Sequence, residues 1–483
     1  MEIRKADIRG RFLDYGILAL LALSPIPAAS VHEWSVLIIE VAVVTLAAVC
    51  LLSQGRLQGN AVLSSSLKWP RRLFLGLFLF LAFQIVPLPK TLAHLLSPQS
   101  YSYRESFSAT FPTENLTTIS VIPGQTLRKA LELLSYVLLG WLIISTVKTR
   151  RQILRIFSVL VVMGTLEAFY GLYELTSASP RILFYPKTHT PEAVTGTFVN
   201  RNHFSGYLEM VIPLAIGLAI ARLDVFSLAG LKWKERLLRF SEKGLATNIL
   251  LSLGIILMSL AIIFSQSRSG VTILILTFIL FSGLTLLHQP SRRQKKRARA
   301  FLAVVFLLVV GISLYVGVRA TLERFSLDRI LHEQRPVFWG HALRIFIRFP
   351  VFGSGLGTLT SLLPDIEQDG SLVRVFHAHN DYLEYLAELG FLGMGLLLAG
   401  ILFLGIKAFL IWRERRHPEV KGLALGASIS IICMLVHSLA DFNLQIPANM
   451  LLFSTVLALA VVTSFYKKGE VQARENRPNE SFG

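Results

Sequence analysis

Residues 390–412, "GFLGMGLLLAGILFLGIKAFLIW", determine the fold class of this chain. The stretch holds one charged side chain, Lys407, and as a helix it is long enough to cross the roughly 30 Å hydrocarbon core of a bilayer. Comparable runs recur along the 483 residues, of which 53% are hydrophobic and only 16% are charged. A soluble protein of this length would carry more charge and would not gather its apolar residues into such runs. The sequence therefore predicts an all-α polytopic membrane protein, with residues 1–483 forming a single integral membrane domain.

Apolar runs of this kind predict about twelve transmembrane helices. The first run follows a basic start and ends in small residues, which imitates a signal peptide. Because so many spans follow it, we interpret this run as an uncleaved first helix. The predicted spans are residues 13–31, 34–52, 72–88, 129–147, 153–175, 204–222, 248–266, 270–287, 301–318, 390–412, 422–440 and 449–466.

The formal net charge is +18, a value that a nucleic-acid-binding protein could also have. The basic residues, however, cluster in short connections between apolar runs on one side, as is typical of cytoplasmic loops. This distribution argues against nucleic acid and makes the lipid bilayer the expected partner. It predicts that both termini, including the tail 467–483, are cytoplasmic. The connections 89–128, 176–203 and 319–389 then face outward, the last as a large periplasmic loop.

Two histidines precede the tenth predicted span, in "FHAHNDYLEYLAELGFLG", residues 376–393. Asp381 and Glu384, three residues apart, predict a helix N-cap with its capping partner. His377 and His379 then lie just outside the helix N-terminus, where the helix dipole disfavours the charged imidazolium. A neutral histidine can accept a proton, so His379 is a candidate general base. The alternative is that both histidines only bond loop carbonyls.

Two further polar clusters lie at outward ends of predicted spans. Arg201, Asn202 and His203 precede the sixth span in "TGTFVNRNHFSGYLEM", residues 195–210. Arg268 occupies a short polar break in "FSQSRSGV", residues 264–271. An arginine at that depth is costly, which predicts an anionic ligand or partner, aided by the N-terminus of the following helix. Snorkelling of Arg268 to the interface is the alternative.

The fourth cluster is "VHSLADFNLQIPANM", residues 436–450, in which His437 and Asp441 are four apart and are predicted to share a helix face. A purely structural hydrogen bond is the alternative reading. In the large loop, "RPVFWGHALRIFIRF" predicts an amphipathic helix that begins near Arg335. The following "GSGLGT" lacks the spacing of a phosphate-binding loop and predicts a plain turn.

All four clusters are predicted to face outward, so they could converge on one cavity. Arginines beside a neutral histidine indicate phosphate chemistry or phosphate transport. No acidic metal-binding motif such as D-x-D is present on the outward side, and the only cysteines, Cys50 and Cys433, lie within apolar runs. The sequence therefore predicts no metal and no other cofactor.

The segment "HAHNDYLEYLAELGFLG" resembles the H-N-x-x-L…E-x-G-x-x-G signature of the O-antigen ligase and polymerase superfamily. "TGTFVNRNHFSGYLEM", "SQSRSG" and "HSLADFNLQIPANM" resemble further segments of its bacterial members, so the likeness covers roughly residues 150–460. The resemblance implies a C-type glycosyltransferase architecture in the bacterial inner membrane. It also implies a donor glycan linked to undecaprenyl diphosphate, and a glycan, lipid A-core or growing polysaccharide as acceptor.

The resemblance implies residue roles as well. His379 matches the family's essential histidine before asparagine, Arg268 matches an arginine proposed to hold the donor diphosphate, and Arg201 matches another. His377 is a second catalytic candidate, and Arg335 is a third donor-binding candidate. The predicted supporting residues are Asn202, His203, Asn380, Asp381, His437 and Asp441.

The chemistry of these residue types is consistent with that function. Fixed arginines neutralise a departing lipid diphosphate, and a neutral histidine activates the acceptor hydroxyl, so direct displacement inverts the anomeric centre. A transporter of lipid-linked glycan also suits twelve helices, but transporters usually place polar groups at the midplane of repeated halves. The gathering of polar residues on one side favours an enzyme. Ligase, polymerase and protein-glycosylating activities all remain open.

Overall fold

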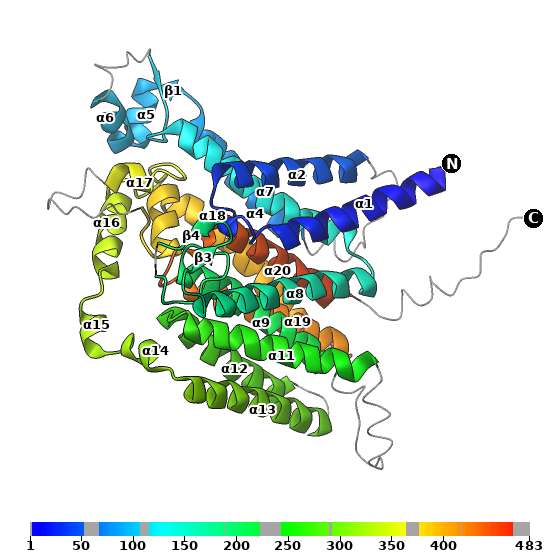
Figure 1. The fold of residues 1–483 in the computed structure, drawn as a ribbon. Helices are drawn as coiled ribbons and strands as arrows, with labels where there is room; N and C mark the ends of the chain where they lie inside the picture. Colours follow the sequence, from blue (N-terminus) through cyan, green and yellow to red (C-terminus); the bar gives the residue numbers. More distant parts are fainter. Residues whose placement is uncertain are drawn as a thin grey trace, which may run out of the picture.

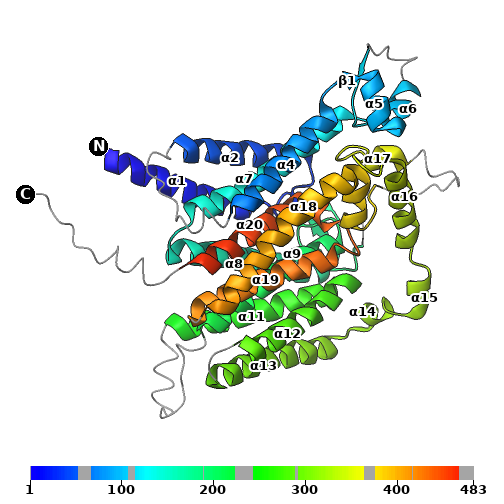
Figure 2. The same ribbon diagram turned by 180° about the vertical axis from the view of Figure 1, so that it is seen from behind.

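The structure is a computed structural model, and it describes residues 2–52, 67–106, 115–188, 190–222, 243–288, 292–363, 376–415 and 417–466. Long helices lie side by side in a bundle (Figures 1 and 2). The long helices are α1 (Glu2–Leu23), α2 (Glu33–Leu52), α4 (Lys68–Ile85), α7 (Pro123–Thr146), α8 (Arg150–Leu175), α9 (Arg201–Arg222), α11 (Lys243–Phe264), α12 (Arg268–His288), α13 (Arg292–Val316), α18 (Asp381–Glu414), α19 (Pro418–His437) and α20 (Pro447–Phe465).

Short elements gather at one end of the bundle, on the left in Figure 1. Strands β1 and β2 pair with each other, as do β3 and β4, and each pair is antiparallel. The short elements are η1 (Ala28–Ser30), β1 (Leu88–Pro89), α5 (Lys90–Leu96), α6 (Pro98–Ser106), β2 (Leu116–Thr117), β3 (Arg181–Ile182), β4 (Tyr185–Pro186), α14 (Arg319–Glu323), α15 (Leu327–Leu331), α16 (Arg335–Arg348), α17 (Leu359–Leu362) and η5 (Asn443–Gln445).

Nine helices of the described residues are long and apolar enough to cross a membrane: α2, α8, α9, α11, α12, α13, α18, α19 and α20. The polytopic all-helical class is therefore confirmed, whereas the count of twelve spans and the periplasmic loop stay predictions. The predicted end of the first span at residue 31 is wrong, because α1 ends at Leu23. Pro25 and Pro27 follow directly, and a proline lacks the N–H that would continue the helix. The tail 467–483 lies outside the described residues.

Helices α9, α19 and α20 form the centre of the bundle, and nearly all of their side chains are buried. Small residues let α9 and α19 pack closely, as is common between membrane helices. A side chain at Gly217 would collide with the backbone of Gly422 and Gly426. This tight central pair fixes the N-terminal end of α9 and the C-terminal end of α19, where the second and fourth polar clusters lie.

The predicted amphipathic helix of the large loop is confirmed as α16. Pro336 stands in its first turn, where a missing N–H costs little. The helix buries His341, Ala342 and Ile345 on one side and exposes Leu343 and Ile347 on the other. It connects the short helices α14 and α15 to α17 (Figure 2).

The "GSGLGT" turn does more than the predicted reversal of the chain, because it bonds to the backbone of α18. Gly390 breaks α18 with a φ of 61°, which frees carbonyl groups in the preceding turn. Ser354 N donates to Ala387 O at 3.1 Å, and Gly355 N donates to Glu388 O at 2.9 Å. A side chain at Gly390 would collide with the Val351 carbonyl. The contact therefore requires glycine and fixes the start of α18, which directly follows the two histidines.

We expect Gly390→Ala to lower the free energy of unfolding by at least about 1–3 kcal/mol, because alanine must adopt a left-handed backbone against a close carbonyl. Gly395→Ala in the same helix is the matched control, since a side chain there meets no neighbour within 4 Å. Thermal unfolding of the detergent-solubilised protein measures both. Equal midpoints for the two variants would contradict this account of the break.

Candidate functional site

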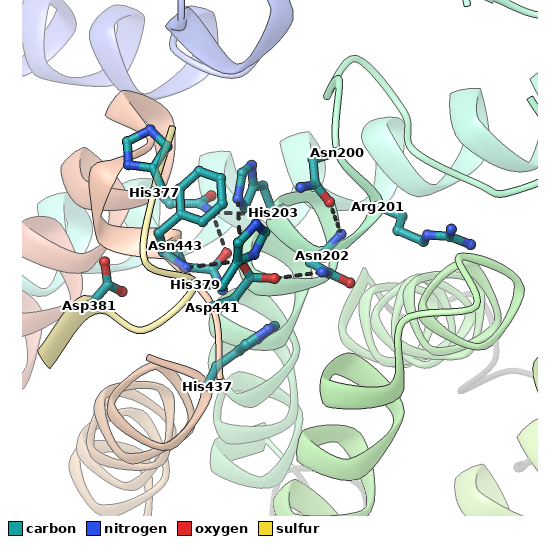
Figure 3. A network of polar contacts seen from close by, with 12 residues as sticks. Asn200, Arg201, Asn202, His203, His377, His379, Asp381, His437, Asp441 and Asn443 are labelled. Carbon is teal, nitrogen blue, oxygen red and sulfur yellow. Dashed lines mark hydrogen bonds and ion pairs between the residues drawn. The ribbon is translucent and has the colours of Figure 1, made fainter. Parts of the chain in front are cut away.

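Asp441 is the centre of a polar network at the N-terminal ends of α9 and α12 and the C-terminal end of α19 (Figure 3). Its side chain is fully buried, at 0% exposure, in the turn between α19 and η5. His379 Nδ1 lies 3.0 Å from Asp441 Oδ1, and Asn202 Nδ2 donates to Asp441 Oδ2 at 2.5 Å. The Phe442 backbone N–H also donates to Oδ1, at 2.9 Å. A buried carboxylate with this many donors is fixed in position.

The surroundings of Asp441 keep it ionised. Burial raises the pKa of its carboxyl, but the hydrogen bond from His379 and the charges of His203 and Arg335 hold that pKa well below its ordinary value. Arg335 lies 3.5 Å from Oδ2, and His203 Nε2 lies 3.9 Å from Oδ1. Asp441 is therefore an anion throughout the physiological range and acts as an acceptor for His379 Nδ1–H.

A chain of hydrogen bonds joins Asp441 to the start of α12. Ser267 Oγ accepts from Gly270 N at 3.2 Å, as an N-cap does, and donates to Asn202 Oδ1 at 2.8 Å. Asn202 in turn donates to Asp441. Each group has one consistent role as donor or acceptor. The first, second, third and fourth predicted clusters thus meet through Ser267, Asn202, Asp441 and His379.

His379 is held in a strained and specific pose. Its backbone has a φ of 50°, in the left-handed region that non-glycine residues seldom occupy but histidine visits more often than most. Trp339 Nε1 donates to the His379 carbonyl at 3.2 Å, and the Phe338 ring stacks on the imidazole with centroids 5.7 Å apart. With Nδ1–H donating to Asp441, Nε2 is the nitrogen with a lone pair to accept a proton.

His379 lines an open cavity of about 560 Å³ beneath α14, α15 and the start of α16. Glu333 forms ion pairs with Arg268 and, at 3.6 Å, with Arg335. The cavity thus gathers guanidinium groups beside an imidazole, which suits an anion with several oxygens. Its charged lining residues are Arg268, Arg324, Asp328, Arg329, Glu333 and Arg335.

Of the five residues predicted to be catalytic or donor-binding, two do not line this cavity. His377 Nδ1 pairs with Glu384 Oε1 at 2.8 Å, and its ring stacks on Phe442 with centroids 4.1 Å apart. Burial lowers the pKa of His377, but the Glu384 charge and hydrogen bond outweigh it and raise that pKa above its ordinary value. Arg201 points away from the His379–Asp441 pair in Figure 3 and lies 4.0 Å from Glu192.

Two predicted local structures are wrong. The N-cap of α18 is Asn380, whose side chain accepts from Leu383 N at 3.1 Å, and not Asp381. Asp381 instead accepts from Ser438 Oγ at 2.8 Å and holds the α19–α20 connection. Glu384 does not form a capping box. It accepts from Ala378 N at 2.9 Å and so holds the segment between His377 and His379.

His437 and Asp441 do not share a helix face, because α19 ends at His437. His437 Nδ1 pairs instead with Glu209 Oε1 of α9 at 2.7 Å, and both side chains are fully buried. His203, the remaining supporting residue, packs edge-on against Phe442 with ring centroids 4.5 Å apart. Because His437 pairs with Glu209, Asp441 accepts a hydrogen bond from His379 and not from His437.

Sequence reasoning missed four residues of this region: Arg324, Arg329, Glu333 and Phe442. The charge bias that drew attention to Arg268 applies equally to Arg324 and Arg329, since both lie in a connection predicted to face outward. Phe442 lies between three histidines, with ring centroids 4.1 Å from His377 and 4.7 Å from His379. Only the folded chain brings that ring to them.

Nine apolar helices in the described part of the chain define a multi-pass membrane protein, and an arginine-rich cavity lies beside its histidine–aspartate pair. The sequence model of the O-antigen ligase family matches residues 253–398, from α11 into α18. This match confirms the resemblance to the O-antigen ligase and polymerase superfamily and indicates a membrane glycosyltransferase of that kind. It contains Arg268, Arg335 and His379, whereas Asn202 and Asp441 lie outside it. No curated protein matches the chain.

Proposed function

We propose that this protein transfers a glycan from an undecaprenyl-diphosphate donor to an acceptor hydroxyl on the periplasmic side of the inner membrane. The observation that carries the proposal is the His379–Asp441 pair, placed on the edge of a cavity lined by four arginines. A base and an anion-binding group are the two parts that such a transfer needs.

The donor diphosphate binds Arg268 and Arg335, with Arg324 and Arg329 on the same cavity. Guanidinium groups bond phosphate oxygens in a bidentate manner and stabilise the charge that grows there as the sugar–phosphate bond breaks. The diphosphate displaces Glu333, which is paired with both Arg268 and Arg335 in this structure. Arg201 pairs with Glu192 and does not line the cavity, so its charge acts on the donor only from a distance.

His379 is the general base. The acceptor O–H gives its proton to His379 Nε2 while the acceptor oxygen bonds to the anomeric carbon of the donor sugar. The bond from that carbon to the phosphate oxygen breaks, and its electron pair leaves with undecaprenyl diphosphate. Asp441 stabilises the imidazolium that forms, and direct displacement inverts the anomeric centre. The roles of His377 and Glu384 are then to shape the loop that presents His379.

Turnover without a gradient tests the class of protein. We expect purified protein in sealed vesicles to consume a lipid-diphosphate-linked glycan with no ion gradient, and to keep most of its turnover in excess chelator because arginines take the role of a metal. A gradient requirement, with glycan moved but not cleaved from its lipid, indicates the transporter instead. Loss of turnover that magnesium or manganese restores would contradict the arginine mechanism.

Labelling of single cysteines tests the periplasmic placement. Arg344→Cys, on the exposed side of α16, should react with an impermeant thiol reagent added to intact spheroplasts, whereas Arg292→Cys, at the start of α13, should react only after lysis. The native Cys50 and Cys433 are buried and give a low background. The reverse labelling pattern would overturn the orientation.

A further inference from the structure

A second cavity, of about 200 Å³, lies between α6 and the C-terminal end of α16. Gln99, Ser102, Tyr103 and Ser106 line one wall, and their spacing of three, four and seven residues places them on one face of α6. The opposite wall is the last turn of α16, including Arg348. The cavity is smaller than the roughly 300–1,000 Å³ of sites that enclose a whole small ligand. It therefore fits one unit of a larger molecule.

The cavity side of α6 is polar and accessible, because Gln99, Ser102 and Ser106 are exposed and Tyr103 is half-buried. The amide of Gln99 and the hydroxyl of Ser102 line the cavity, and Ser106 Oγ beside them donates to Tyr103 O at 2.6 Å. The helix is nevertheless firmly held. Arg104 Nε donates to Thr117 Oγ1 at 3.0 Å and its guanidinium donates to Val121 O at 3.3 Å. Polar side chains on a firmly held helix are what a polar ligand requires.

The second cavity and the cavity lined by His379, Arg268 and Arg335, which we call the reaction cavity, are both lined by residues of α16. Helix α16 begins with Arg335 at the reaction cavity and ends with Arg348 at the second cavity, a distance of about 20 Å for its 14 residues. A small apolar core that includes Ala342, Ile345 and Leu362 lies along this helix. Phe338 of the reaction cavity and Tyr103 of the second cavity both pack against that core. The spacing of the two cavities is therefore fixed.

We propose that the second cavity binds a sugar residue of the glycan, several units from the bond that reacts. A sugar ring presents C–H groups to an apolar or aromatic surface and hydroxyls to amide and hydroxyl partners. The cavity offers both kinds of wall, with Phe349 and Leu362 as the apolar part and Gln99, Ser102 and Ser106 as the polar part. A lipid tail would need an apolar lining throughout, and a phosphate would need more cations than Arg348. The inference rests on the glycan transfer proposed above.

Dependence on glycan length tests this inference. The probes are lipid-diphosphate-linked glycans from the host's own pool, separated by chain length. For the wild-type protein we expect KM to fall by about tenfold once the glycan is long enough to reach the second cavity, because a second contact on one molecule adds to the first. Ser102→Trp, which fills the cavity, should remove this length advantage while leaving turnover of the shortest donor unchanged. Arg348→Gln should reduce the advantage in part.

Arg344→Gln is the matched control, since Arg344 lies one turn earlier on α16 and lines neither cavity. A wild-type KM that does not depend on length, or a Ser102→Trp variant that keeps the length advantage, overturns the inference. A Ser102→Trp variant that slows turnover of the shortest donor as much as turnover of the longer donors also overturns the inference. The substitution would then act by damaging the protein and not by blocking a sugar site. Absence of turnover with every donor refutes the proposed function itself, and the sugar site with it.

Discussion

Replacing His379 by asparagine is expected to lower the rate of glycan transfer by about 10²–10⁴-fold while leaving donor binding nearly unchanged. The imidazole accepts the acceptor proton only as the sugar–phosphate bond breaks, so its loss is felt in the transition state and not in the bound ground state. The cavity arginines that hold the donor are unaffected. Single-turnover rates at saturating donor, together with donor titrations, separate the two effects.

Asparagine is the informative substitution because His379 has a left-handed backbone, which asparagine also tolerates. His379→Ala would add backbone strain to the loss of the base. His377→Asn is the matched control, since His377 pairs with Glu384 and does not line the reaction cavity. A folded His379→Asn protein that transfers at the wild-type rate removes the base from this mechanism. A His377→Asn protein that loses as much activity moves the base to His377.

Asp441→Asn should reproduce part of the His379 effect, because an amide can offer its N–H to His379 Nδ1 and so favour the wrong tautomer. The buried carboxylate also stabilises the imidazolium formed during transfer. Asn202→Leu, which removes one donor to Asp441, should have the same direction and a smaller size. These variants separate a positioning role from simple folding if thermal midpoints stay near that of the wild type.

The sequence was sufficient to predict the helical membrane fold. Apolar runs such as 390–412 are long enough to cross the bilayer, whose interior admits only helices or closed barrels. It also predicted that His379, Arg268 and Arg335 face the same side. The pairing of His379 with Asp441 was not predictable, since the two residues are 62 positions apart. Asp441 was instead assigned to His437 by helical spacing, and that spacing failed because α19 ends before Asp441.

The capping prediction failed for a related reason. Both Asn380 and Asp381 are good N-cap residues, and local sequence does not separate them. The tertiary fold does, since Asp381 also accepts from Leu444 N at 3.1 Å and is thereby committed to the α19–α20 connection. The role of "GSGLGT" likewise depends on the break at Gly390, which lies more than thirty residues later. Local patterns thus determine elements, whereas long-range hydrogen bonds determine the site.

Replacing Arg268 by alanine is expected to weaken donor binding and to slow transfer, each by about ten- to a hundredfold, the range for a lost hydrogen bond to a charged group. Both steps suffer because the diphosphate is already anionic when it binds and gains charge as the bond breaks. Arg268→Lys should recover little, since an ammonium cannot form the bidentate contact. Inorganic pyrophosphate, used as an inhibitor, reports the binding step alone.

A substitution of Glu333 should change pyrophosphate affinity in the direction opposite to Arg268→Ala. Because Glu333 pairs with Arg268 and Arg335, the donor diphosphate must displace it, and Glu333→Gln should bind pyrophosphate several-fold more tightly. Glu323→Gln is the matched control, since Glu323 pairs with the exposed Arg319 and lines no part of the cavity. Rising salt should narrow the gap between Glu333→Gln and the wild type, because screening weakens the carboxylate that competes. If Arg268→Ala binds pyrophosphate as the wild type does, and Glu333→Gln binds it no better, the diphosphate does not bind in this cavity.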